Sequence, residues 1–132
     1  MIDNREQPRW QKLAPFARHL GVRFLEAPAG SAAAVLALTP ELANRKGDMH
    51  GGAMASLLDL TAGQALRGSS TEIKGVATVS MTTNYLETAA GEITARAQVI
   101  KAGRTIGWVD ARAETAAGVV VATASCTFRI IR

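Results

Sequence analysis

The sequence predicts an α+β domain in which a curved antiparallel sheet of about six strands wraps around one long central helix. Three observations lead to this fold class: two short alternating segments near the start, one long helical pattern after them, and four longer alternating segments in the second half. Alternation with a period of two is typical of strands that bury one face, whereas a period of 3.6 is typical of an amphipathic helix. A curved sheet around the helix is the simplest way to bury it.

Length and composition set the scale of this domain. The chain has 132 residues, of which 48% are hydrophobic but only 5% aromatic. We therefore expect a single domain over residues 1–132. Few large side chains are available to build the core of such a chain. We therefore expect some of its apolar surface to be buried against a second copy of the chain.

The charge balance favours an anionic partner without selecting one. The net charge is +4, but the basic residues are scattered and never form a run of three, so a nucleic-acid-binding segment is not indicated. No apolar run approaches the roughly 20 residues that span a bilayer, and residues 1–7 lack the apolar core of a secretory signal. We expect a cytoplasmic protein that binds neither nucleic acid nor membrane.

The chain has a single cysteine, Cys126, within an apolar alternating segment. It cannot form a disulfide within the chain, and a metal site built on cysteines cannot be assembled. We interpret it as a small buried hydrophobic residue rather than a reactive thiol.

Residues 1–20 carry apolar side chains at helical spacing and form the expected N-terminal helical segment. Pro15 interrupts the pattern, which predicts two short helical pieces or a kink. Gly21 then ends the segment.

Two strands and a brief helix are expected next. Residues 22–27 and 31–38 have strand character, and the Ala-Pro-Ala-Gly sequence at 27–30 has the composition of a hairpin turn. Thr39 as a cap and Pro40 at the first helical position indicate a short helix.

Residues 52–67 form the strongest helical pattern in the chain, with Arg67 suited to the negative end of the helix dipole and Gly68 as the terminator. One face is expected to enter the core. The core face comprises Met54, Leu57, Leu58, Thr61 and Ala65. A second face is small except for one carboxylate, and it comprises Gly52, Ala55, Ser56, Asp59 and Gly63.

The second half has the alternation of four long strands separated by glycine-containing reversals. These reversals, at Gly91, Gly103 and Gly118, predict an antiparallel meander. The four strands are expected over residues 75–87, 92–101, 105–115 and 119–131.

Asp59 is the first candidate for chemistry, because it has poor helix propensity and no basic neighbour at helix-contact spacing. A solvated surface carboxylate is the alternative. The second candidate is the His50-Gly51-Gly52 sequence at the helix start, where free N–H groups stabilise negative charge such as the oxyanion formed from a thioester. A tight loop-to-helix turn is the alternative there.

His50 does not indicate a metal site or a catalytic triad. A zinc site needs three or four ligands, and the only other histidine is His19. No serine or cysteine is marked as a nucleophile. We expect His50 to orient the loop by hydrogen bonding, His19 to be structural, and the protein to hold no metal and no cofactor.

The segment from Asn44 to Asp59, NRKGDMHGGAMASLLD, resembles the signature of the PaaI-type (phenylacetate-degradation) acyl-CoA thioesterases. In that family an N-x-x-G-x-x-H-G-G loop leads into the central helix of the hotdog fold, and an aspartate follows nine residues after the histidine. The resemblance extends from about Phe16 over the rest of the chain. Weaker similarity lies at residues 75–79, 84–86, 103–105 and 121–128.

The resemblance implies a role for each residue of the motif. Asp59 would be the general base or nucleophile, the Gly51 N–H would bind the thioester carbonyl oxygen, Asn44 would help to polarise it, and Thr78 would hold the attacking water. His50 belongs to the same catalytic loop. Alternation groups Thr78 with Val76, Ser80, Thr82 and Asn84. Whether this face meets Asp59 stays open.

The same resemblance implies a substrate and an assembly. The expected reaction is hydrolysis of aromatic or medium-chain acyl-CoA to free acid and CoA, which is a substrate rather than a cofactor. Gly52 and Ser56 would contact the substrate, and Lys101, Arg104 and Lys46 are candidates for the phosphates.

A homo-oligomer is expected, with a dimer as the catalytic unit, residues of both chains in each active site, and a dimer of dimers (homotetramer) as the assembly. The alternatives are a hotdog protein that binds acyl-CoA without turnover and a hotdog enoyl-CoA hydratase or dehydratase.

Overall fold

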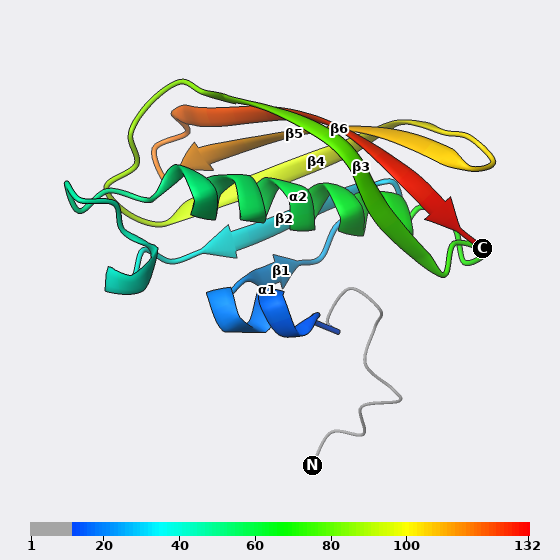
Figure 1. Ribbon diagram of the computed structural model, residues 1–132, viewed down its shortest axis with the longest axis horizontal. Coiled ribbons are helices and arrows are strands. Elements are labelled where there is room, and N and C mark those ends of the chain that lie inside the picture. The colour runs from blue at the N-terminus through cyan, green and yellow to red at the C-terminus, as the bar shows by residue number, and fades with distance from the viewer. Residues whose placement is uncertain (1–11) are drawn as a thin grey trace, which may run out of the picture.

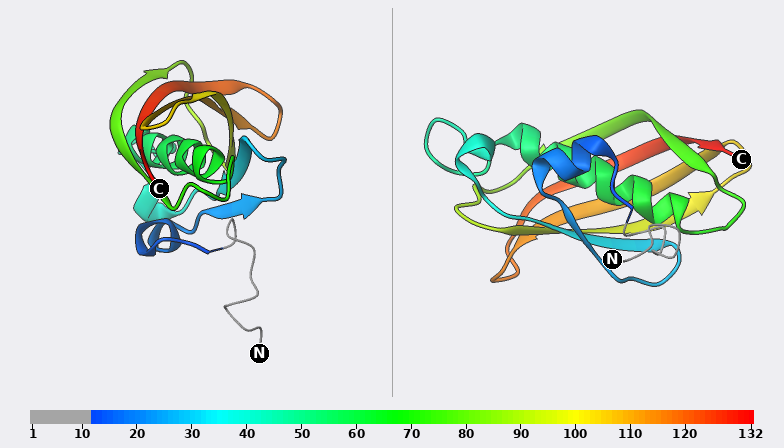
Figure 2. Two further views of the ribbon diagram at one scale, coloured as in Figure 1. Left: turned by 90° about the vertical axis from the view of Figure 1, so that its right-hand side faces the viewer. Right: turned by 90° about the horizontal axis from the view of Figure 1, so that it is seen from below.

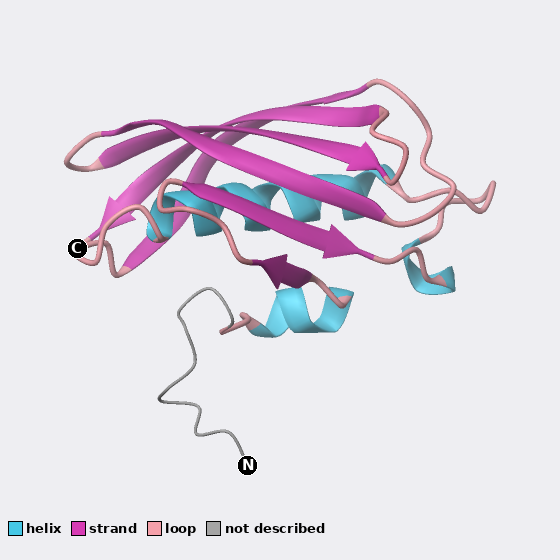
Figure 3. Ribbon diagram, turned by 180° about the vertical axis from the view of Figure 1, so that it is seen from behind, coloured by secondary structure: helices cyan, strands magenta, loops and turns pink. Residues whose placement is uncertain are grey.

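The computed structural model describes residues 12–132, so the part of the expected N-terminal segment before residue 12 lies outside the described residues. One curved antiparallel sheet wraps around the central helix α2 (Gly51–Arg67), as Figures 1 and 2 show from three directions. Figure 3 shows the sheet from behind, with α2 on its other face. The predicted α+β architecture is confirmed.

The sheet has the strand order β1-β2-β4-β5-β6-β3. The strands are β1 (Arg23–Leu25), β2 (Ser31–Leu36), β3 (Gly75–Tyr85), β4 (Ile93–Ala102), β5 (Ile106–Thr115) and β6 (Val120–Ile131). The predicted meander holds for β4, β5 and β6, but β3 does not pair with β4. It pairs instead with β6 at the far edge, and β4 pairs with β2.

The connection between β3 and β4 explains why the four-strand meander is wrong. Residues 86–92 do not form a tight hairpin but cross from the outer edge of the sheet to the side of β2. The buried Ala89 in this crossing accepts a hydrogen bond from the Met49 N–H at 2.8 Å. The crossing is therefore tied to the loop that precedes α2.

The first elements follow the sequence closely. Helix α1 (Pro15–Leu20) begins at Pro15, where the missing N–H is not needed. Residues 12–14 are not helical, and the part of the chain where a first helical piece is expected lies mostly outside the described residues. Strands β1 and β2 form the predicted hairpin. The brief helix η2 (Pro40–Leu42) starts at Pro40 as expected, but the Thr39 side chain makes no capping hydrogen bond.

The core lies between α2 and the concave face of the sheet. All members of the predicted core face of α2 are buried, and Thr61 satisfies its hydroxyl by donating to the Leu57 carbonyl at 2.6 Å. Many of the facing positions of the sheet are alanine, including Ala34, Ala95, Ala97, Ala111, Ala113, Ala122 and Ala124. Small side chains there let the sheet lie close to the helix, which accounts for a core with few large residues.

None of the helices within residues 12–132 is long and apolar enough to cross a membrane. The cytoplasmic location stays a prediction.

Candidate active site

The N-terminus of α2 presents one uncommitted amide. The Gly52 N–H donates to His50 Nδ1 at 2.8 Å, and the Ala53 and Met54 N–H groups donate to the His50 carbonyl. The Gly51 N–H donates to no group among residues 12–132. The first N–H groups of a helix have no partner within the helix and carry the positive end of its dipole. The Gly51 N–H is therefore placed to bind an oxygen that carries a full or partial negative charge.

His50 acts as the cap of the helix. Its Nδ1 accepts the Gly52 N–H, so a neutral ring carries its proton on Nε2. This is the orienting role that the sequence predicts for the histidine. A Cβ at Gly52 would lie 3.0 Å from His50 Nδ1, so glycine at this position leaves room for the cap.

The loop before the helix is built around Asn44. Its side-chain oxygen accepts from the N–H groups of Lys46 and Asp48 at 2.9 and 3.1 Å. The turn closes at Gly47, which has a φ of 88°, a conformation that glycine adopts without cost. With the oxygen committed to the turn, the Asn44 NH2 group has no partner among residues 12–132.

The Asp59 carboxylate lies in the middle of α2 and is half-buried. The exposed Thr78 hydroxyl donates to Asp59 Oδ1 at 2.7 Å. The structure therefore brings together the two side chains whose meeting the sequence left open.

A β-bulge in β3 produces this contact. Thr78 pairs with Phe128 and Ser80 pairs with Thr127, so Val79 is an extra residue in β3. Before the bulge, Thr78 faces the helix; after it, the helix-facing positions are Met81, Thr83 and Tyr85, which pair with inward-facing residues of β6. The extra residue reverses the alternation.

The bulge also corrects the sequence grouping. Ser80, Thr82 and Asn84 pair with the outward-facing Thr127, Ser125 and Thr123. They therefore lie on the outer face of the sheet, opposite to Thr78, and do not join the candidate site.

Tyr85 also lies in this region, although it is not among the site residues that the sequence predicts. Its hydroxyl donates to the Gly51 carbonyl at 3.0 Å, and a Cβ at Gly51 would lie 3.2 Å from Tyr85 Cε1. The side chain is 54% exposed. The only signal in the sequence was that this is the single tyrosine of the chain, in a segment similar to the thioesterase family.

The carboxylate and the free amide are too far apart to act on one group within a chain. Asp59 and Gly51 are eight residues apart on α2, which corresponds to about 12 Å at the helical rise. Reacting groups need to approach to about 3–3.5 Å. One chain therefore does not bring these two candidate groups together.

Two residues on the small-residue face of α2 have structural roles within the chain. The Ser56 hydroxyl donates to the Gly52 carbonyl at 2.8 Å, so its proton is committed to the helix. A Cβ at Gly63 would lie 3.5 Å from both Phe128 Cε1 and Val76 Cγ2, so Gly63 packs against the chain's own sheet.

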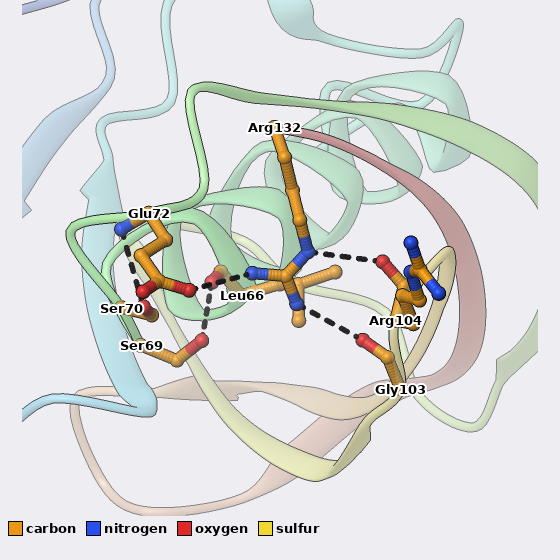
Figure 4. Close-up of polar contacts among 7 residues, drawn as sticks. All are labelled: Leu66, Ser69, Ser70, Glu72, Gly103, Arg104 and Arg132. Atoms are coloured by element: carbon orange, nitrogen blue, oxygen red, sulfur yellow. Dashed lines mark hydrogen bonds and ion pairs between the residues drawn. The ribbon is translucent and has the colours of Figure 1, made fainter.

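The cations suggested for CoA binding lie at opposite ends of α2. Lys46 is in the loop before the helix, whereas Lys101 and Arg104 flank the β4–β5 turn near the helix C-terminus. Figure 4 shows that turn held by Arg132, whose Nε and Nη2 donate to the carbonyls of Arg104 and Gly103 at 3.0 and 3.3 Å. One chain does not bring the three cations together.

Cys126 lies on the inner face of β6, opposite Met81 of β3. Burial, together with the negative charges of Asp59 and Asp110, raises the pKa of its thiol to about 11. The thiol is 2% exposed, which agrees with its interpretation as a small buried residue.

Two grooves, of about 470 and 230 Å³, lie elsewhere on the described chain. The larger is on the outer face of the sheet, beside Ser31, Gln98 and Asp110. Neither is lined by Asp59 or Gly51. No group of three or more His, Cys, Asp or Glu side chains within residues 12–132 is placed to hold a metal ion.

Comparison with known proteins gives consistent matches. Residues 46–122 match the family model of the thioesterase superfamily. A Halobacterium salinarum protein named as a candidate esterase is 33% identical over 95 residues, which is 66% of this chain and 63% of that protein. The matched region thus spans less than two thirds of that relative.

Solved structures show the same fold. A conserved protein of Pseudomonas aeruginosa is 31% identical, with a TM-score of 0.87 over 95% of this chain and 100% of that one. The PaaI protein of the Escherichia coli phenylacetic acid degradation operon is 22% identical, with a TM-score of 0.83 over 90% of this chain and 86% of that one. The resemblance stated from the loop-and-helix motif is confirmed, and the fold is the hotdog fold.

Proposed function

Because this chain belongs to the thioesterase superfamily, we propose that it is an acyl-CoA thioesterase that hydrolyses aromatic or medium-chain acyl-CoA to the free acid and CoA. The observation that carries the proposal is the Asp59 carboxylate bound by the Thr78 hydroxyl at 2.7 Å, on the same helix that begins with the free Gly51 N–H. These are a base or nucleophile with its positioning group and an oxyanion donor.

The reaction uses only protein groups and water. The thioester carbonyl oxygen accepts from the Gly51 N–H, and the free NH2 of Asn44 supplies a second donor. The Thr78 hydroxyl donates a hydrogen bond to Asp59, so its oxygen can accept a hydrogen bond from a water molecule. Asp59 takes a proton from that water as the water oxygen bonds to the carbonyl carbon. The C–S bond then breaks, and the CoA sulfur leaves with the proton that Asp59 took from the water, which restores the carboxylate. In the nucleophilic variant, Asp59 attacks first and water cleaves the resulting anhydride.

The active site is assembled from two copies of the chain. The separation of about 12 Å along α2 prevents Asp59 from reaching a carbonyl held by the Gly51 amide of its own chain. A second copy, running in the opposite direction, supplies the missing half. Strand β3 is an edge strand, with Val79 60% exposed, and a partner copy would cover it. The catalytic unit is a homodimer, and the full assembly is a dimer of dimers.

Opposite helix directions also bring the cations together. Lys46 lies at the start of α2, and Lys101 and Arg104 lie at its far end. In the proposed dimer, the far end of one helix extends past the start of the other, toward the loop that carries the partner's Lys46, so cations from both chains flank one site. Their charge suits the phosphates of CoA.

Thiol release from a panel of acyl-CoA esters tests the proposal. Asp59→Asn should lower turnover by about 10²- to 10⁴-fold because it removes the base or nucleophile. The matched control is Asp110→Asn, since Asp110 is an exposed carboxylate on the outer face of the sheet; its turnover should match that of the unmodified protein. Equal rates for the unmodified and Asp59→Asn proteins would contradict the mechanism. Binding of acyl-CoA without thiol release would favour the non-catalytic alternative.

A further inference from the structure

Tyr85 occupies a position that its backbone environment fixes. It is the last residue of β3 and pairs with the buried Ala122 of β6. The bulge at Val79 turns it toward α2. Without that extra residue, strand alternation would place the side chain on the outer face. The fold thus directs an aromatic ring to the start of the helix.

The ring lies directly against the residue that carries the free amide. A Cβ at Gly51 would be 3.2 Å from Tyr85 Cε1 and 3.4 Å from Cζ, so only glycine leaves the ring room without displacement. The hydroxyl donates to the Gly51 carbonyl at 3.0 Å. Both the ring carbons and the hydroxyl of Tyr85 are therefore fixed against Gly51.

Much of the ring is nevertheless open. Tyr85 is 54% exposed, although its hydroxyl is already hydrogen-bonded. A fixed, half-exposed aromatic side chain offers contact area at little cost in side-chain entropy. An oxygen bound to the Gly51 N–H would lie about 2.9 Å from that nitrogen, on the same residue that the ring contacts.

We propose that Tyr85 is a specificity-determining residue, whose ring forms a wall of the acyl subsite beside the Gly51 amide. This rests on the proposed function, in which the thioester carbonyl binds that amide. A planar acyl group next to the carbonyl can stack on the ring or meet its edge, whereas a flexible alkyl chain gains less from it. The hydroxyl bond to the Gly51 carbonyl keeps the wall in place.

Two substitutions separate the ring from its hydroxyl. Tyr85→Leu removes the ring, and Tyr85→Phe keeps the ring but removes the bond to the Gly51 carbonyl. Trp108→Leu is the control, because it removes a 42%-exposed aromatic ring from the outer face of β5. Benzoyl-CoA and heptanoyl-CoA serve as probes, since they have the same number of acyl carbons.

The readout is the ratio of kcat/KM for benzoyl-CoA to that for heptanoyl-CoA. Tyr85→Leu should lower this ratio by about three- to tenfold, while Tyr85→Phe and Trp108→Leu should keep most of it. A merely structural role would lower both rates together. An unchanged ratio in Tyr85→Leu would overturn the inference and leave the proposed function standing.

Binding distinguishes the two proposals. Calorimetry with ketone analogues, in which a methylene separates the sulfur from the carbonyl, measures the same selectivity without turnover. Selective loss of benzoyl-analogue binding in Tyr85→Leu would support the inference even if no thiol were released. If the unmodified protein neither binds nor cleaves either probe, both proposals fail.

Discussion

The division of the active site between two chains can be tested by mixing two inactive variants. Asp59→Asn removes the carboxylate, and Gly51→Pro removes the amide proton. Proline suits this position, because Gly51 is the first residue of α2 and His50 has an extended ψ of 138°. The control is Gly51→Ala, which introduces the same Cβ near Tyr85 Cε1, at 3.2 Å, but keeps the N–H.

The expected yield of intact sites follows from the geometry. Asp59 and Gly51 are about 12 Å apart within one chain, so each site takes one residue from each copy. With random pairing of equal amounts, half of the dimers are mixed, and one of the two sites in each mixed dimer is intact. The mixture should therefore show about a quarter of the activity of the unmodified protein per site.

The two variants would be denatured together, refolded as a mixture, and assayed for thiol release. Each pure variant, taken through the same procedure, sets the baseline, and Gly51→Ala reports the effect of the added methyl group alone. Activity of the mixture no higher than the mean of the two pure variants would refute a shared site and place the carboxylate and amide in one chain.

Three further predictions concern single residues. Thr78→Val should lower kcat by about ten- to hundredfold because the charged hydrogen bond is lost, whereas Thr78→Ser should keep most of it; equal effects would show that the hydroxyl is not needed. Gly107→Ala should reduce the free energy of unfolding, measured in urea, by about 1–3 kcal/mol, because the new Cβ would lie 2.6 Å from Leu66 Cδ2. The control is Gly91→Ala, whose Cβ would meet nothing within 4 Å; it should change the free energy of unfolding by no more than about 0.5 kcal/mol. The pKa of the Cys126 thiol is raised from 9.0 to about 11 in the folded protein, so between these pH values the thiol ionises in the unfolded chain but not in the folded one. The free energy of unfolding should therefore fall as pH rises from 9 to 11. In Cys126→Ala the urea midpoint should fall less steeply with pH, and the same dependence in both proteins would contradict the raised pKa.

The central helix could be predicted well from sequence, because its signals are local. Apolar spacing, the glycines at its start and Gly68 at its end fix its limits to within one residue of the observed Gly51–Arg67. Asp59 can be identified for the same reason, because it is the one carboxylate on a helix face that otherwise carries small side chains. The hairpin of β1 and β2 likewise follows from its turn residues.

Strand order and the details of the site could not be predicted in this way. Alternation shows that a strand buries one face, but it does not show which strand is its neighbour. The sequence therefore predicts β3 beside β4, whereas β3 lies beside β6. The bulge at Val79 adds one residue to a pairing that sequence alone does not reveal. Both the Thr78–Asp59 contact and the position of Tyr85 depend on that residue.

The spacing of the two functional groups on α2 also locates the symmetry axis of the proposed dimer. A dyad perpendicular to the helices brings Asp59 level with the partner's amide only if it crosses α2 halfway between Gly51 and Asp59, at Ala55. Ala55 is a partly exposed residue with a small side chain, so two helix backbones can come close at that point. The alanine is then the centre about which both active sites are arranged.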